Sequence, residues 1–402
     1  MMKKVNKFVL YLGLIILMIG SVLTSRPLVS HAATTVNANA AFAIDAQTGQ
    51  VLYNKNGDQR LAVASMSKLL TVAVIEHEID RGNLKWSTKV KITAAEAKLS
   101  TASGYSNVPL KAGHSYTVKQ LTEAALIKSG DAATIALTRA EGKSTKQFVS
   151  QMNAMAKRIG LTNYRFYNGI GLENKDMASF KLANTAGSAE NQMTARDVAK
   201  LAQYLIKNYP DLLNITKQKT LKWSGQTYQN LNELLPGNAN ATKKITVDGL
   251  KTGTSDKAGQ CLVSTGTYHG HRLIVVVMHA DNRFTQSKVI YSAVFSQWQP
   301  TSAKLSKTVK VSRGRVKTVR VQTKQKVTVW QPRSKKASAQ WIANRKYRDG
   351  TQLKAPFKAN TQVGKLRFNQ LKKVNGHVLE FGVYSTRDVH RRGLFGWLAS
   401  LF

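Results

Sequence analysis

Ser65 and Lys68 are two residues of complementary chemistry, three positions apart, at the start of a long apolar segment. Residues 65–80 are predicted to form a helix, and at this spacing both side chains point to one side, where amine and hydroxyl can hydrogen-bond. A serine becomes a nucleophile when an adjacent base takes its proton, and lysine is a base only when neutral. The pair predicts acyl transfer through Ser65, with its backbone N–H favouring an oxyanion at the helix N-terminus.

A second lysine, Lys251, opens the run Lys251-Thr252-Gly253 after a strand-like stretch at residues 245–250. Its positive charge is the expected cause of a lowered pKa at Lys68. Gly253 would leave room for a substrate backbone to approach and pair with this strand.

Ser129 stands between these two runs, in Ser129-Gly130-Asp131, just before a predicted helix at residues 131–140. Its hydroxyl can face a cleft that holds both lysines. A serine before such a helix is also a common helix cap, which is the competing interpretation.

These three runs, in this order, match the motif set of serine β-lactamases and penicillin-binding proteins. The chain resembles the low-molecular-mass penicillin-binding proteins that act as serine-type D-alanyl-D-alanine carboxypeptidases, the peptidase S11 family. Five further stretches look like segments of that family: residues 44–52, 64–69, 168–172, 194–197 and 248–253.

The resemblance implies that Ser65 attacks the carbonyl between the two terminal D-alanines of a peptidoglycan stem peptide and forms an acyl-enzyme. Lys68 would take the serine proton and later activate water, and Ser129 would relay a proton to the leaving D-alanine. β-Lactam antibiotics would be covalent inhibitors. The family needs no metal and no organic cofactor.

The resemblance also implies a substrate-binding set on the second lysine motif. Lys251 and Thr252 would bind the terminal carboxylate, and the N–H groups of Ser65 and Thr254 would form the oxyanion hole. Asp131 departs from the family, which commonly has Asn there, since a carboxylate only accepts hydrogen bonds. Beside two lysines it would ionise and keep Lys68 more protonated.

The pattern of elements predicts an α/β (α+β) fold of the β-lactamase/transpeptidase type over residues 39–300, with one antiparallel sheet and helices against it. Further helices are predicted at residues 118–126, 145–159 and 194–208. Residues 301–388 have short alternating apolar runs, which predict a small all-β domain. From residue 301 onward the chain has 24 lysines and arginines against three acids, so this domain is strongly basic.

Both ends of the chain carry apolar segments. Residues 1–32 read as a signal peptide, with an uncleaved membrane anchor as the alternative. Residues 389–402 read as an amphipathic tail that lies in a membrane interface, or that packs on the β domain instead.

A net charge of +39 usually suggests nucleic acid, but the predicted export points instead to anionic partners outside the cytoplasm. Acidic wall polymers or an anionic membrane surface fit an exported protein at the outer face of the bacterial membrane or in the wall.

Three alternative functions remain at this stage. A β-lactamase would need a deacylating glutamate, for which Glu173 lacks a convincing setting. An endopeptidase or transpeptidase would use the same motifs. A non-catalytic or weakly active envelope protein that binds anionic wall polymers would belong to a different class. The single cysteine, Cys261, excludes an intramolecular disulfide and is expected to be a small core residue.

Overall fold

A five-stranded antiparallel sheet forms the centre of the N-terminal domain in the computed structural model, which describes residues 35–393. The predicted signal peptide and residues 394–402 of the predicted tail lie outside this range. The strand order is β2-β1-β11-β10-β9. Bounds are Ala38–Asp45 for β1, Val51–Lys55 for β2, Thr246–Ser255 for β9, Gly259–Tyr268 for β10 and His271–Ala280 for β11.

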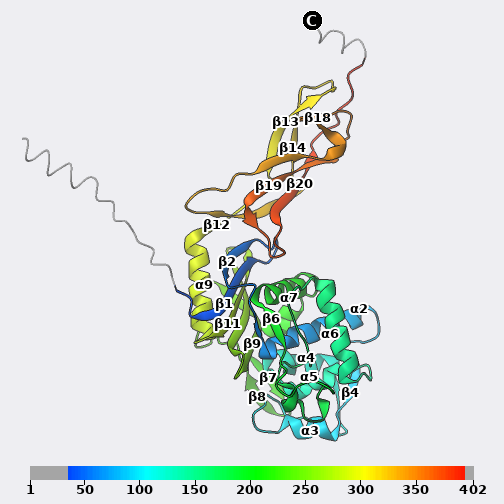
Figure 1. Ribbon diagram of the computed structural model, residues 1–402, viewed down its shortest axis with the longest axis vertical. Coiled ribbons are helices and arrows are strands. Elements are labelled where there is room, and N and C mark those ends of the chain that lie inside the picture. The colour runs from blue at the N-terminus through cyan, green and yellow to red at the C-terminus, as the bar shows by residue number, and fades with distance from the viewer. Residues whose placement is uncertain (1–34, 394–402) are drawn as a thin grey trace, which may run out of the picture. The chain divides into compact units, whose positions relative to one another are not determined.

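Both faces of this sheet are covered by helices (Figure 1). Along β11, Ile274 and Val276 pack into the cluster that contains α2 (Lys68–Asp80), whereas Val275 and Val277 pack beneath α9 (Arg283–Gln297). A strand that is buried on both faces has apolar residues at consecutive positions, and residues 273–278 form such a run. The predicted antiparallel sheet with helices against it is confirmed.

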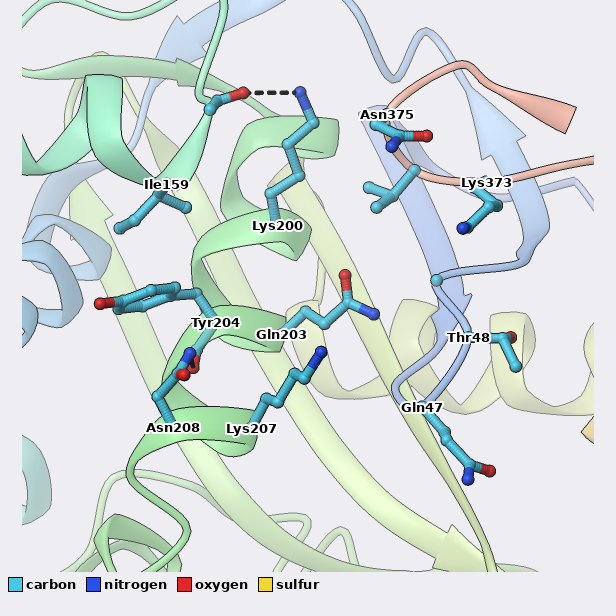
Figure 2. Close-up of a pocket in the computed structure, with 13 residues that line it drawn as sticks. Gln47, Thr48, Ile159, Lys200, Gln203, Tyr204, Lys207, Asn208, Lys373 and Asn375 are labelled. Carbon is cyan, nitrogen blue, oxygen red and sulfur yellow. Dashed lines mark hydrogen bonds between the residues drawn. The ribbon is translucent and has the colours of Figure 1, made fainter. Parts of the chain in front are cut away.

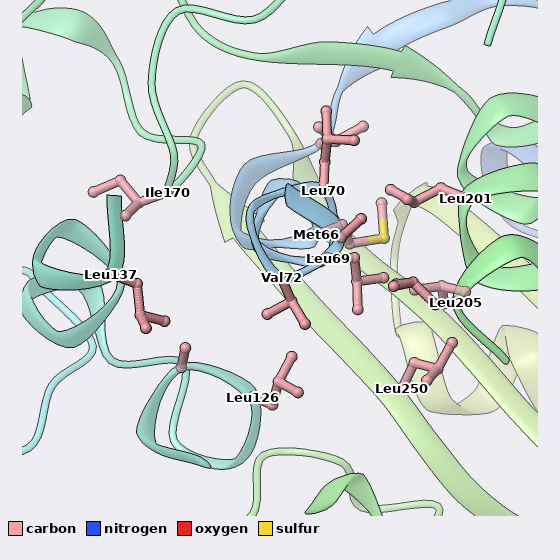
Figure 3. Close-up of a cluster of buried hydrophobic side chains, with 14 of the residues drawn as sticks. Met66, Leu69, Leu70, Val72, Leu126, Leu137, Ile170, Leu201, Leu205 and Leu250 are labelled. Carbon is pink, nitrogen blue, oxygen red and sulfur yellow. The ribbon is translucent and has the colours of Figure 1, made fainter. Parts of the chain in front are cut away.

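Helix α2 runs through the interior, as its apolar sequence predicts. Leu69, Leu70, Val72 and Ile75 are each at most 1% exposed. Figure 3 shows how side chains of this segment point to different neighbours around the helix axis. Each fully buried leucine contributes roughly 1.5–3 kcal/mol, so the packing holds the N-terminal end of α2 rigidly.

The other predicted helices lie within two residues of their expected bounds. Three helices begin with a reciprocal capping box, namely Thr93 with Glu96, Thr117 with Gln120 and Ser144 with Gln147. The helices are α3 (Ala94–Ser100), α4 (Val118–Ile127), α5 (Asp131–Thr138), α6 (Thr145–Ile159), α7 (Ala195–Asn208) and α8 (Leu212–Thr216).

Three two-stranded ribbons and two 3-10 segments complete the described part of this domain. The ribbons pair β3 (Arg60–Ala62) with β6 (Gln192–Thr194), β4 (Lys89–Lys91) with β5 (Ser115–Thr117), and β7 (Thr220–Trp223) with β8 (Gln226–Gln229). The 3-10 segments are η1 (Ala64–Ser67) and η2 (Asn174–Phe180).

The C-terminal domain is all-β apart from one 3-10 turn, η3 (Arg345–Tyr347), as predicted. A seven-stranded and a two-stranded sheet enclose cores of valine, leucine and phenylalanine. The strands are β12 (Trp298–Ala303), β13 (Ser306–Ser312), β14 (Thr318–Gln322), β15 (Val327–Pro332), β16 (Gln340–Ala343), β17 (Arg348–Asp349), β18 (Gln352–Lys354), β19 (Gln362–Lys372) and β20 (Val378–Ser385). No helix within residues 35–393 has the length and apolar character that crossing a membrane requires.

Trp330 of β15 is fully buried against the turn between β1 and β2. Its indole N–H donates to Asp45 Oδ2 at 2.9 Å. The Gln50 side chain accepts from the Trp330 backbone N–H at 2.9 Å and donates to its carbonyl at 2.7 Å. These bonds satisfy every polar group that the burial of Trp330 removes from water.

Glu76 on α2 generates a prediction about stability. Burial raises its pKa to about 7, and the Asp80 and Asp211 carboxylates add to the shift. The folded protein therefore holds this proton more tightly than the unfolded chain does, and stability is lost as pH rises from about 4.5 to about 7. Glu76→Gln should stabilise the protein at pH 8 by about 1–2 kcal/mol once solvent screening is allowed for.

Urea unfolding of the two proteins at about pH 4 and pH 8 measures this difference. The variant and the wild type should match at the lower pH, where Glu76 is neutral in both states. An equal gap at both pH values would contradict the prediction.

Candidate active site

Ser65 lies in the 3-10 turn η1 (Ala64–Ser67), directly before α2. The predicted α-helix was expected to begin at Ser65, but α2 begins at Lys68, so the expected start of the helix is wrong by three residues. The expected contact is present nevertheless: Lys68 Nζ is 3.1 Å from Ser65 Oγ.

Lys68 is fully buried and has three further acceptors around its amine. Nζ is 3.0 Å from Ser129 Oγ, 2.5 Å from the Ser129 carbonyl and 2.7 Å from Asp131 Oδ1. Burial lowers the pKa of Lys68, and the Asp131 carboxylate opposes that shift. An ammonium has only three protons for these four oxygens, whereas a neutral amine has a lone pair for the Ser65 proton.

Lys251 is also buried, at 2% exposure. It lies within β9, because this strand continues through Lys251-Thr252-Gly253, whereas the sequence predicted a strand that ends at residue 250. Nζ donates to Ser129 Oγ and to the Thr252 carbonyl, each at 2.9 Å. Burial and the charge of Lys68 lower the pKa of Lys251 well below its usual value. The expectation that the charge of Lys251 lowers the pKa of Lys68 is wrong: burial lowers that pKa, and the charge of Lys68 acts on Lys251.

Ser129 joins the two lysines, because its hydroxyl lies within hydrogen-bonding distance of both amines. The helix-cap interpretation is wrong: the residue before α5 is Gly130, and the side chain that accepts from the first turn of this helix is Asn107, whose Oδ1 is 2.9 Å from the Ala132 backbone nitrogen. Ser129 has a φ of 61°, which is uncommon for a residue other than glycine. Backbone strain of this kind is concentrated at functional sites.

Asp131 has both carboxylate oxygens engaged within the protein. Oδ1 accepts from Lys68, and Oδ2 accepts from the Ser106 backbone N–H at 3.0 Å. The residue is 3% exposed, and its ion pair makes it the counterion of Lys68.

Gly253 makes room for the protein's own backbone, which corrects the expectation that it makes room for substrate. A Cβ there would lie 2.7 Å from the Val63 carbonyl and 3.2 Å from the Met66 nitrogen, on either side of Ser65. The glycine therefore lets β9 pack directly against η1. Of the neighbouring motif residues, Thr252 is 6% exposed and Thr254 is open to solvent.

Arg283, at the start of α9, belongs to this group although its sequence position did not indicate it. Its guanidinium donates to the Gly253 carbonyl at 2.9 Å and to Thr254 Oγ1 at 2.5 Å. Burial lowers the pKa of Arg283, but an arginine keeps its charge in proteins. The hairpin of β10 and β11 brings it back to β9, so only the sheet pairing could have revealed it.

The loop at residues 168–172 supports η1 from below. Asn168 Oδ1 accepts from the Gly171 backbone N–H at 2.7 Å, and its Nδ2 donates to the Leu172 carbonyl at 2.8 Å. Gly171 has a φ of 88°, and a Cβ on it would lie only 1.9 Å from the Ala64 carbonyl. This turn of the chain can pass under Ser65 only with glycine at position 171.

Comparison with known proteins agrees with this geometry. A family model described as D-alanyl-D-alanine carboxypeptidase, Peptidase S11, matches residues 27–282, and one for the C-terminal domain of penicillin-binding protein 5 matches residues 295–391. The chain belongs to the peptidase S11 family. The predicted family, fold class and class of enzyme, a serine hydrolase of the D-alanyl-D-alanine carboxypeptidase type, are confirmed.

Two of the three similar proteins named here cover about nine-tenths of this chain, and the third covers 65%. D-alanyl-D-alanine carboxypeptidase DacF of Bacillus subtilis is 29% identical over 90% of this chain and 88% of its own length. The structure of PBP3 from Streptococcus pneumoniae, described as a peptidoglycan synthesis regulatory factor, superposes with a TM-score of 0.76 at 29% identity, covering 89% of this chain and 100% of that one. Penicillin-binding protein D2 of Listeria monocytogenes, in its ampicillin-bound form, has a TM-score of 0.54 at 26% identity and covers 65% of this chain and 98% of its own.

Glu173 does not favour a β-lactamase. Its carboxylate forms ion pairs with Lys175, at 2.8 Å, and with Lys257, and both cations lower its pKa. It hydrogen-bonds to neither Ser65 nor Lys68. Cys261 is fully buried and its pKa is raised to about 11, as expected of a core thiol.

Gly171→Ala tests whether the loop positions Ser65. The added methyl must displace η1, and a misplacement of about 1 Å can cost on the order of 100-fold in rate. We expect acylation by a fluorescent penicillin to slow at least tenfold, measured in stopped-flow. The matched control is Gly104→Ala, because Gly104 has a similar φ of 84° and nothing within 4 Å of its Cβ position. Equal rates in the two variants would show that backbone strain alone explains the effect.

Proposed function

We propose that Ser65 attacks the carbonyl carbon between the two terminal D-alanines of a peptidoglycan stem peptide, releases D-alanine and forms an ester that water hydrolyses. The observation that carries this proposal is the 3.1 Å contact between Ser65 Oγ and the buried amine of Lys68, whose pKa is lowered. Membership in the carboxypeptidase family gives the class of reaction and its place in cell-wall synthesis. The non-catalytic alternative is not favoured.

The proton would travel through the hydrogen-bonded group beneath Ser65. Neutral Lys68 accepts the hydroxyl proton as Oγ bonds to the carbonyl carbon, giving an ammonium beside Asp131. Ser129 contacts Lys68 and Lys251 at once, so it can pass a proton to the nitrogen of the departing D-alanine. In the second half-reaction Lys68 takes a proton from water as the water oxygen bonds to the acyl carbon. It then returns that proton to Ser65 Oγ as the ester bond breaks.

Substrate binding would use β9, which is an edge strand of the sheet. Its outer edge can pair with an extended peptide as an added strand. The N–H groups of Ser65 and Thr254 are the proposed oxyanion donors. The hydroxyls of Thr252 and Thr254, with Lys251, are the proposed ligands of the terminal carboxylate. We assign the formal positive charge there to Arg283, which holds Thr254 and keeps its charge in proteins.

β-Lactams are expected to acylate the same serine. The Listeria relative was solved with ampicillin bound. A β-lactam presents a strained amide and a carboxylate in the places of the scissile bond and the terminal carboxylate, so the groups proposed above would serve both. We further propose export through residues 1–32 and association of the basic C-terminal domain and tail with an anionic membrane surface or wall polymer, supported by the excess of lysine and arginine.

Ser65→Ala should abolish both D-alanine release from a pentapeptide ending in D-Ala-D-Ala and covalent labelling by fluorescent penicillin. Ser67→Ala is the matched control, because the Ser67 hydroxyl is buried without a hydrogen-bond partner within residues 35–393. That variant should keep at least about half of the wild-type rate. Labelling that survives in Ser65→Ala would refute the assignment of the nucleophile.

Asp131→Asn tests the base. Without the carboxylate, the pKa of Lys68 falls further, so the neutral amine is present at lower pH. The acidic limb of the acylation rate should therefore move down by about one pH unit, measured between about pH 4.5 and 9. Asp349→Asn, in the C-terminal domain, removes the same charge far along the chain and should leave the profile in place. An unshifted profile in Asp131→Asn would exclude Lys68 as the titrating base.

A further inference from the structure

We propose that a second, non-catalytic site binds a phosphate group on a water-soluble polyhydroxyl carrier, such as a polyol-phosphate polymer. The site is a cavity of about 560 Å³ lined by α7, the β1–β2 turn and the turn between β19 and β20 (Figure 2). It lies at the β1–β2 side of the sheet, whereas the candidate active site uses β9 at the opposite edge. The inference does not depend on acyl transfer at Ser65.

Three lysines give the cavity its charge. Lys200 and Lys207 come from α7, and Lys373 comes from the β19–β20 turn. Within residues 35–393, the amines of Lys207 and Lys373 have neither a hydrogen bond nor an ion pair, although Lys373 is half-buried. Lys207 is exposed, and the two cations together make this part of the lining positive, which attracts an anion.

The nearest carboxylate does not neutralise this group. Asp197 is buried and accepts hydrogen bonds from the backbone N–H groups of Thr162, at 3.1 Å, and Asn163, at 2.9 Å. Lys200 lies 3.5 Å from it and also donates to the Gly160 carbonyl at 3.0 Å, the bond drawn in Figure 2. The other two lysines are left as open positive charges.

Neutral hydrogen-bonding groups line the rest of the cavity. Gln203 is held in place by a bond from Nε2 to the Ala46 carbonyl at 2.9 Å, and in Figure 2 it lies between α7 and the β1–β2 turn. Amide and hydroxyl groups of this kind bind sugar or polyol hydroxyls. The others on the lining are Gln47, Thr48, Tyr204, Asn208 and Asn375.

The wall that carries Lys373 is fixed to the N-terminal domain. Val374 is 5% exposed in the main core, and its N–H donates to the Gly49 carbonyl at 2.7 Å. Its own carbonyl accepts from Arg196 at 3.3 Å. A Cβ on Gly49 would lie 3.2 Å from Gln203 Nε2, so the turn and the helix are closely packed at this point. The cavity is therefore a built feature and not a gap between mobile loops.

The lining favours a soluble carrier over a lipid. Only Ile159 and Val374 are aliphatic, and Val374 is buried beneath the surface. A headgroup site on a membrane needs exposed apolar side chains at its rim to enter the interface. The lining of this cavity has amide and hydroxyl groups in place of such apolar side chains.

The test measures binding of a glycerol-phosphate oligomer by calorimetry to the full chain and to Lys207→Gln/Lys373→Gln. We expect the double variant to bind at least tenfold more weakly. The control Lys307→Gln/Lys310→Gln removes the same charge from exposed positions of β13 and should bind within twofold of wild type. D-alanine release should be unchanged in both, which separates this result from failure of the catalytic proposal.

Equal losses in the two double variants would overturn the site, since diffuse charge would then explain binding. Vesicles containing phosphatidylglycerol provide the second arm. A cavity-specific loss seen with vesicles and not with the oligomer would overturn the soluble carrier in favour of a lipid. Inorganic phosphate should compete with the oligomer, and an absence of competition would contradict recognition through phosphate.

Discussion

Two lysine amines and a single carboxylate share an interior that water hardly reaches. Lys68 and Lys251 are almost completely buried, and both contact the hydroxyl of Ser129. Burying each charge costs several kcal/mol even after relaxation, so the group is stable only if a proton is given up or a counterion is supplied. Asp131 is the counterion of Lys68. In the described part of the chain, Lys251 has no such carboxylate beside its amine, and burial lowers its pKa, which favours loss of its proton. The surrounding fold therefore determines the proton affinity of the Lys68 and Lys251 amines.

Three segments must be placed together to maintain this arrangement. The N-terminal end of α2 contributes Lys68, and β9 contributes Lys251. Ser129 comes from the loop before α5, and Asp131 is the first residue of that helix. Close backbone approach makes it possible, since Gly253 lets β9 touch η1 and Gly171 lets the supporting loop pass beneath Ala64. The packing of α2 on all sides then prevents the amine of Lys68 from moving toward water.

Local spacing was enough to predict the contact between Ser65 and Lys68, because a helical turn imposes it whatever the rest of the fold does. The pattern of apolar runs along the chain predicted the sheet, the helices and the all-β domain, in agreement with the family resemblance. Sequence could not reveal Arg283, which reaches Thr254 only through the β10–β11 hairpin, nor Ser106, which bonds to Asp131 from a loop. It also misassigned the space at Gly253 and the cause of the lowered pKa at Lys68, since both depend on which atoms are nearest in three dimensions.

The pairing of β1 with β11 has a consequence for how the enzyme is made. Ala43 stands opposite Val275, so the first strand to be synthesised finds its central partner only when most of the N-terminal domain has followed. Pairings between such distant segments form slowly and leave strand edges exposed in the meantime. A chain that is still growing at residue 250 would hold Ser65, Lys68 and Ser129, yet it would lack Lys251 and the central strands β10 and β11 against which α2 is buried. The nucleophile is thus among the first functional groups to be synthesised, and its reactivity appears only near the end.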